Sequence, residues 1–236
     1  MRHPSILLLV FAGLLTAGHP TAAAAPTMLT NGRIRAEFGD RGLLSLTDIA
    51  SQASYRIDGD DFALAIGGET FDSRSLAPPT RTAAKDKLAY TWTAGRYQVL
   101  VAYDLAATWR FLSKQISVVA APGNAIHVDE VVVFRETLAD PIVDAYVPKS
   151  ARPNLGTGDY GACLRFDKTR GLLVTAQNPF LAFANKAESF SLAYKPDLDW
   201  NKADGPVVAD RGHQAPVPLT RRRQPHRLVP EWVHAA

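Results

Sequence analysis

Residues 88–103 read LAYTWTAGRYQVLVAY, and this stretch decides the fold of the chain. Leu88, Tyr90 and Trp92 alternate with small or polar residues, which is typical of a strand with one buried face. An alanine–glycine turn then leads into a second such run, residues 97–103. The stretch therefore predicts two neighbouring strands whose large side chains line a core.

The same alternation recurs along the chain in about eleven short runs separated by Gly, Pro, Asn or Asp. The runs are residues 34–38, 43–46, 62–66, 88–93, 97–103, 109–119, 126–135, 162–166, 172–176, 180–183 and 190–194. After residue 25, no segment keeps the apolar spacing of a helix, and no repeat has a fixed period. The sequence therefore predicts an all-β protein, a large two-layer β-sandwich with mostly antiparallel strands.

The first 25 residues have the features of an export signal. Arg2 gives a positive start, residues 6–15 are continuously apolar, and small residues end the segment at Ala25. This order is typical of a cleaved secretory signal peptide, with an uncleaved anchor as the alternative. The apolar run is too short to span a bilayer, which takes about 20 residues. We expect a secreted or periplasmic protein that has no membrane contact after cleavage.

The formal net charge of +3 comes from the two ends of the chain. Arg2 contributes +1 and residues 221–236 contribute +3, so residues 3–220 carry −1. Residues 212–236 contain four prolines and three consecutive arginines, without apolar alternation. We therefore expect a sandwich over residues 26–211 and an irregular basic linker or tail after it. An exported protein with a near-neutral body is not expected to bind nucleic acid.

The sequence contains no recognisable motif for binding a metal or another cofactor. Cys163, the single cysteine, alternates with apolar neighbours and is expected to pack in a strand. There is no cysteine pair, no His-x-x-x-His and no calcium loop, so we expect no metal and no other cofactor. The acidic residues 58–61 and the glycine-rich residues 154–161 are interpreted as an ordinary turn and an extended loop.

Two segments near the start resemble a known kind of sandwich. Residues 31–38 (NGRIRAEF) and 42–48 (GLLSLTD), with residues 109–111 (WRF) before a long strand, are similar to the β-supersandwich of secreted glycoside hydrolases. That domain is galactose mutarotase-like, and in the α-galactosidase-like (melibiase) group it precedes a (β/α)8 catalytic barrel. The resemblance implies a non-catalytic N-terminal module, structural or carbohydrate-handling, in a natural or truncated chain that lacks its catalytic domain. Its expected partners are a carbohydrate or that downstream domain.

A free-standing enzyme of the aldose-mutarotase type is the first alternative. Such chemistry needs a general base and a general acid, typically a carboxylate and a histidine. His127 is the only histidine in the predicted sandwich, which argues against paired catalytic histidines. The two-residue period of its strand places His127 with Asp129 on one face and Glu130 on the opposite, apolar face with Val128. His127 and Glu130 are the catalytic candidates, and a solvated or arginine-paired surface is the competing interpretation.

A lectin-like protein is the second alternative. Sugars bind where an aromatic ring stacks on the pyranose while carboxylates or amides hold its hydroxyls. Residues 194–201 have this composition, with Tyr194, Asp197 and Trp200 as candidate substrate-binding residues. Asp159 is a further candidate in the glycine-rich loop. Interdomain packing is the competing interpretation for both segments.

Overall fold

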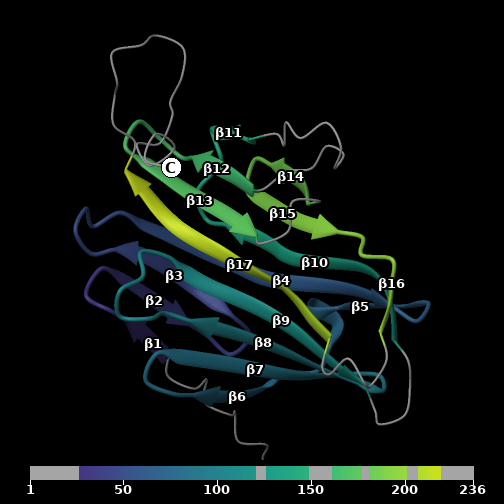
Figure 1. Cartoon of the computed structure of the whole chain (residues 1–236). Helices are drawn as coiled ribbons and strands as arrows, with labels where there is room; N and C mark the ends of the chain where they lie inside the picture. The colour runs from purple at the N-terminus through teal and green to yellow at the C-terminus, as the bar shows by residue number, and fades with distance from the viewer. Residues whose placement is uncertain (1–26, 121–125, 149–160, 177–180, 201–206, 219–236) are drawn as a thin grey trace, which may run out of the picture.

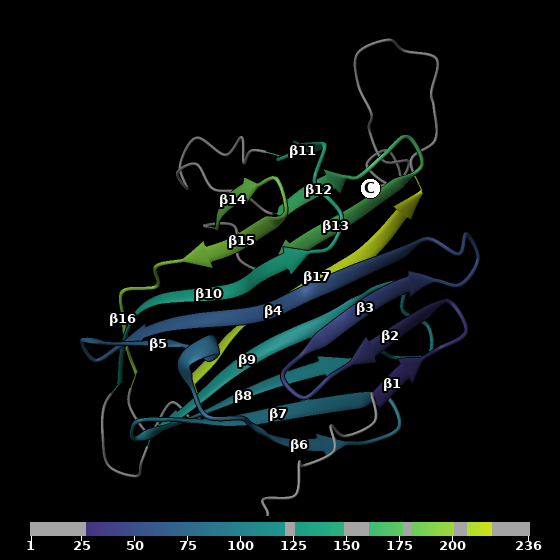
Figure 2. The same ribbon diagram turned by 180° about the vertical axis from the view of Figure 1, so that it is seen from behind.

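The computed structural model describes residues 27–120, 126–148, 161–176, 181–200 and 207–218. In these ranges the chain forms seventeen strands, and its helical content is one 3-10 turn, η1 (Ser73–Ser75). Over the same ranges, no helix has the length and apolar character needed to cross a membrane. The strands pair antiparallel in two sheets that face each other (Figures 1 and 2). The predicted all-β, two-layer antiparallel sandwich is confirmed.

The first sheet has nine strands, with β4 and β10 at its centre. Its main path runs through β1 (Thr27–Thr30), β2 (Ile34–Phe38), β3 (Leu43–Asp48), β4 (Ser54–Ile66), β10 (Ile126–Leu138), β15 (Ser189–Tyr194) and β14 (Ala182–Lys186). Two short strands extend it, β5 (Glu69–Asp72) beside β4 and β16 (Leu198–Trp200) beside β10.

The second sheet has eight strands and covers the inner face of the first. Its order is β11 (Asp144–Tyr146), β12 (Gly161–Arg165), β13 (Arg170–Ala176), β17 (Val207–Pro218), β9 (Leu112–Ala120), β8 (Tyr97–Asp104), β7 (Lys87–Ala94) and β6 (Thr80–Ala83). The β7–β8 hairpin is the pair of strands that the opening stretch of sequence predicts.

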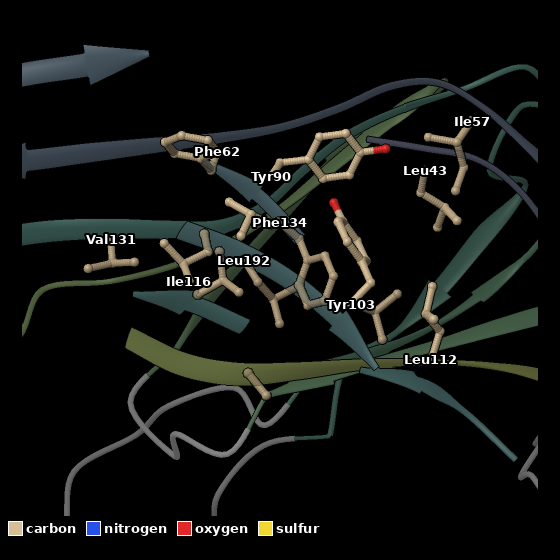
Figure 3. Close-up of a cluster of buried hydrophobic side chains, with 14 of the residues drawn as sticks. Leu43, Ile57, Phe62, Tyr90, Tyr103, Leu112, Ile116, Val131, Phe134 and Leu192 are labelled. Atoms are coloured by element: carbon tan, nitrogen blue, oxygen red, sulfur yellow. The ribbon is translucent and has the colours of Figure 1, made fainter. Parts of the chain in front are cut away.

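The core lies between the two sheets and is rich in aromatic rings. Leu88, Tyr90 and Trp92 of β7 are all buried, as their alternation predicts. Trp92 meets Phe62 of the opposite sheet edge-on, with 5.1 Å between ring centroids, an arrangement that adds attraction beyond apolar burial. Figure 3 shows Phe62, Tyr90 and Tyr103 among aliphatic side chains of both sheets. The contact between Trp92 and Phe62 joins the two sheets across the core.

Two of the three register shifts between β10 and β4 decide which side chains in the middle of β10 face the core. In the pairing with β4, the register shifts between Val128 and Glu130 and again between Val132 and Arg135. A bulge inserts an extra residue and so reverses the side-chain alternation. Val131 is therefore buried together with Val128, whereas Glu130 and Val132 are only half-buried. The predicted placement of Glu130 on the same apolar face as Val128 is wrong.

Strand β17 changes the predicted boundary of the sandwich. It lies between β13 and β9 in the middle of the eight-stranded sheet (Figure 1). Residues 212–218 therefore belong to a strand, although the sequence predicts an irregular tail from residue 212. Pairing with β9 ends at Gln214, so Pro216 pairs with β13 alone. A proline, which has no N–H donor, is tolerated where one side of the strand lacks a partner.

The side chain of Asn31, in the predicted turn, also forms hydrogen bonds with the loop between β8 and β9. The Asn31 Oδ1 atom accepts the backbone N–H of Ile34 at 3.0 Å. Its Nδ2 atom donates to the carbonyls of Ala106 at 2.8 Å and Trp109 at 2.9 Å. Trp109 lies in this loop, and the strand expected from residue 109 begins at Leu112. One amide thus ties the first hairpin to the connection between β8 and β9.

A buried ion pair joins the two sheets. The Nζ atom of Lys114 on β9 lies 2.5 Å from Oδ1 of Asp60 on β4, and the two side chains are 2% and 1% exposed. The Oδ2 atom of Asp60 accepts hydrogen bonds from the Tyr103 hydroxyl and from the Leu43 N–H. The sequence interpretation of residues 58–61 as an ordinary turn is therefore wrong, because they lie within β4 and Asp60 points inward.

Candidate functional site

The pairing of β16 with β10 brings two sets of predicted site residues together. In this register Ile126 pairs with Trp200 and His127 pairs with Asp199. The catalytic candidate His127 therefore lies beside the stretch 194–201, which the sequence predicts as a sugar-binding segment. These two strand segments are separated by about seventy residues in the chain, so only the sheet topology can unite them.

His127 is surrounded by three carboxylates, a group we call the His127 cluster. Its Nδ1 atom lies 2.8 Å from Oδ1 of Asp199. Its Nε2 atom lies 3.2 Å from Oδ1 of Asp197 and 3.3 Å from Oδ1 of Asp129. A carboxylate can only accept, so both ring nitrogens must donate for all three contacts to be hydrogen-bonded. The arrangement therefore favours the imidazolium form.

The charge of the cluster follows from these contacts. The hydrogen bond to Asp199 raises the pKa of His127, and the negative charges of Asp129, Asp199 and Asp197 act in the same direction. The side chains are exposed, from 39% for His127 to 88% for Asp197. Ion pairs this accessible to water contribute little to folding stability. The cluster is therefore a surface feature available to a ligand, with three acceptor groups around one donor ring.

The backbone of the β15–β16 connection helps to place the acidic side chains. Asp197 has a φ of +46°, a left-handed conformation that Asp adopts more readily than most residues. Asp199 follows two residues later in β16, so both carboxylates reach the same histidine. Asp197 is one of the binding residues predicted from the sequence, whereas Asp199 lies in the predicted segment 194–201 without being one of them. The available signal was the Asp-x-Asp spacing itself, two carboxylates two residues apart in a segment that also contains Tyr194 and Trp200.

The remaining predicted residues lie apart from these contacts or outside the described ranges. Glu130 is half-buried on β10, beyond the first bulge from His127. Tyr194 ends β15 and packs partly against the core. Trp200 pairs with Ile126 through its backbone, and its side chain is outside the described part of the structure. Asp159 lies outside the described residues.

The acidic groups do not form a metal centre. Over the described ranges, no group of three or more His, Cys, Asp or Glu side chains is arranged to hold a metal ion. In the His127 cluster, Asp199 approaches one side of the ring and Asp197 and Asp129 approach the other, so their oxygens do not converge on one point. Cys163 is half-buried, and burial raises the pKa of its thiol to about 11, which suppresses thiolate chemistry.

A hollow separate from the His127 cluster lies beside the β2–β3 turn. It has a volume of about 590 Å³ and is lined by that turn, by residues 57–61 of β4, by Arg74 and by Thr137. The guanidinium of Arg41 fixes the turn through the carbonyls of Ser73 and Leu76. Of its acidic lining residues, Asp60 is already engaged by Lys114. Apolar side chains such as Leu44 and Ile57 line the hollow together with the polar ones, and it contains none of the residues predicted from the sequence as sugar-binding.

Comparisons with known proteins give structural neighbours only. No family model and no curated protein matches the chain. A galactose mutarotase-related enzyme from Lactobacillus acidophilus is similar over 81% of this chain and 97% of that chain, with 10% identity and a TM-score of 0.49. A polysaccharide lyase is similar over 81% of this chain and 32% of that chain, with 15% identity and a TM-score of 0.45. A bacterial glucoamylase complexed with acarbose is similar over 83% of this chain and 32% of that chain, with 7% identity and a TM-score of 0.51.

The likeness to the glucoamylase concerns the fold alone, because only 7% of the aligned residues are identical. This chain corresponds to about a third of that enzyme's length, as the 32% coverage states. The molecule is thus a large antiparallel β-sandwich of a kind that also occurs within a longer carbohydrate-active enzyme. Membership of the α-galactosidase-like group stays a prediction from the sequence.

Proposed function

We propose that this chain is a non-catalytic, carbohydrate-binding β-sandwich module of a secreted glycoside hydrolase, and that it binds sugar at the His127 cluster. The observation that carries the proposal is the open arrangement of three carboxylates around one imidazolium ring. Sugar hydroxyls donate hydrogen bonds to carboxylates, and hydrogen bonds to charged groups are among the stronger ones in water. The cluster therefore offers the acceptors that hold a polyol.

The exposure of the cluster favours binding over catalysis. Asp197 and Asp199 are 88% and 83% exposed and His127 is 39% exposed, so the carboxylates around the imidazole face water. Acid–base catalysis on a sugar benefits from a site that excludes water and fixes the substrate. A long, flat or branched glycan can instead lie across an open edge of a sheet. We infer that the ligand is an oligosaccharide or polysaccharide.

Removal of the acceptor charges is expected to weaken glycan binding. We expect Asp197→Asn/Asp199→Asn to lower the affinity for a bound galacto-oligosaccharide or soluble polysaccharide by about tenfold or more, because charge-assisted hydrogen bonds become neutral. Isothermal titration calorimetry and affinity gel electrophoresis against a panel of polysaccharides would measure it. Asp58→Asn, which neutralises an exposed carboxylate on β4, is the matched control and should bind as the wild type does.

Two results would count against the binding proposal. One is the absence of binding to any member of the panel by the wild-type protein. The other is equal loss of affinity in Asp58→Asn and in the double variant, which would indicate a general effect of charge rather than contacts at the cluster. Trp200→Ala adds a test of ring stacking by the residue predicted from the sequence.

An aldose-mutarotase activity is the second candidate, favoured by one observation. The imidazole of His127 lies within 2.8–3.3 Å of three carboxylates. An imidazole and a carboxylate together could donate and accept protons at a sugar ring. For a binding module we expect no acceleration of α-D-galactose mutarotation above the buffer rate, as followed by polarimetry. An acceleration that His127→Ala abolishes and Glu130→Gln leaves intact would establish the enzyme instead.

Export and the larger parent protein are further parts of the proposal. N-terminal sequencing of the protein recovered from the periplasm or medium is expected to begin at Ala25 or Pro26. DNA sequencing beyond codon 236 should reveal a frame, intact or shifted, that encodes a catalytic barrel. A genome without such a frame would leave a free-standing lectin-like protein as the better description.

A further inference from the structure

The inner faces of the two sheets contain a second polar contact, next to the Lys114–Asp60 ion pair. Glu136 projects from β10 and Gln214 from β17, and they are 1% and 2% exposed. The Nε2 atom of Gln214 donates a hydrogen bond to Oε1 of Glu136. β10 belongs to the nine-stranded sheet and β17 to the eight-stranded sheet, so this contact connects the two layers.

Each of the two side chains also has one buried oxygen that has no hydrogen-bond partner among the described residues. These atoms are Oε2 of Glu136 and Oε1 of Gln214. With Glu136 ionised, both are acceptors, and a buried acceptor without a donor is costly. A proton on Oε2 of Glu136 turns that oxygen into a donor. The Oε1 atom of Gln214 can then accept its hydrogen bond, so both oxygens gain a partner. A protonated acid and a primary amide can thus form two reciprocal hydrogen bonds.

We propose that Glu136 carries a proton in the native state and forms a reciprocal acid–amide pair with Gln214, which acts as a pH-sensitive clamp between the two sheets. The clamp is independent of carbohydrate binding at the His127 cluster. It closes when Glu136 is protonated and opens when the proton leaves, because two carboxylate oxygens then face an amide that has only one donor directed at them.

The charged groups around the pair agree with a neutral Glu136. Asp60 on β4 faces it with a negative charge, and the buried hydroxyl of Tyr103 on β8 is already bonded to Asp60. Lys114 on β9 is the one nearby cation among the described residues, and its Nζ atom is engaged by Asp60 at 2.5 Å. Burial, followed by the charge of Asp60, raises the pKa of Glu136 to about 8, against the opposing effects of Lys114 and the Gln214 hydrogen bond.

The location of the clamp suggests what it controls. Gln214 is the last residue of β17 that pairs with β9, so beyond it the strand is held by β13 alone. Opening of the acid–amide pair removes an attachment to the opposite sheet at the point where one of the two ladders ends. We infer that residues 214–218 detach from the sandwich more easily above the pKa of Glu136 than below it.

The clamp can be tested on the full chain by NMR and thermal unfolding. The side-chain carboxyl 13C signal of Glu136 is expected to titrate with a midpoint near 8, instead of the ordinary 4.5. The native state then holds a proton that the unfolded chain has already lost, so the melting temperature should fall as pH rises from about 4.5 through about 8. Amide exchange is base-catalysed and speeds up with pH in any chain, so its protection factors are compared instead of its raw rates. Those of Gln214, Ala215 and Val217, the residues of this segment that have a backbone N–H, should fall over the same range.

Glu136→Gln is the informative variant, because an amide pair can make both reciprocal hydrogen bonds without a titrating proton. We expect it to lose the Glu136-dependent part of the fall in melting temperature and to be more stable than wild type at pH 9. Glu37→Gln, at a half-exposed position, should keep the wild-type slope. A wild-type Glu136 signal that titrates near 4.5, or an unchanged slope in Glu136→Gln, would overturn the proposal. The NMR titration decides the question even where the variant fails to fold.

Discussion

Lys114→Met is expected to lower the free energy of unfolding by about 3–5 kcal/mol, the usual cost of breaking a buried ion pair from one side. The substitution leaves the carboxylate of Asp60, which is 1% exposed, without its cation. The hydrogen bonds from Tyr103 and Leu43 to Asp60 would remain but cannot neutralise its charge. Urea unfolding at pH 7, followed by tryptophan fluorescence and circular dichroism, measures the loss.

The partner substitution provides the control for this prediction. In Asp60→Asn/Lys114→Met, neither buried charge remains, and a double-mutant cycle should show that much of the single-variant loss is recovered. The methionine chain can still pack against Phe134, whose ring centroid lies 5.2 Å from the Lys114 Nζ atom. If the two single losses simply add in the double variant, the pair is not the unit that stabilises this part of the core.

Trp92→Ala is expected to destabilise the protein by about 3–5 kcal/mol, because it empties the largest ring site in the core. Trp92 is buried, contacts Phe62 of the opposite sheet at 5.1 Å and lies 5.7 Å from the Tyr90 ring. The loss therefore affects the packing of both layers. Chemical denaturation with a two-state fit gives the value, and the slope of the transition should remain that of the wild type.

Trp92→Phe separates ring packing from the indole nitrogen. The Nε1 atom of Trp92 is buried and has no hydrogen-bond partner in the described structure. Phenylalanine removes this unsatisfied donor while keeping a ring against Phe62. We expect a loss of stability less than half of that in Trp92→Ala. An equal loss in both variants would indicate that the indole nitrogen has a partner that matters.

The sequence predicts the fold class well because apolar alternation is a local property. The hairpin built around Tyr90 and Trp92 follows from residue types that are close in the chain, and the buried faces agree with them. Bulges are different, because they arise from the pairing of β10 with β4 and leave no local mark in the residues 126–134. The position of Glu130 could not be predicted for this reason.

The candidate site was predictable in its parts but not in its assembly. His127 and Asp197 were each identified from residue type, and the pairing of β16 with β10 makes them neighbours. The local pattern also failed to predict the end of β17, because a proline such as Pro216 is typical of a loop. It is compatible with a strand here only because β9 does not pair with that residue, which the sequence does not show. Glu136 and Gln214 were missed altogether, since nothing in the linear sequence indicates that two polar side chains meet between sheets.

The position of β17 between β13 and β9 affects the order in which the eight-stranded sheet can assemble. β17 is the last described strand in the chain, yet it separates β9 from β13, which pair with it on either side. The eight-stranded sheet therefore stays in two pieces, each with an open edge, until residues 207–218 have been synthesised and paired. Open strand edges pair readily with other chains. A fragment that stops at residue 211 would keep those edges partly exposed, and we expect it to aggregate more readily than the full chain.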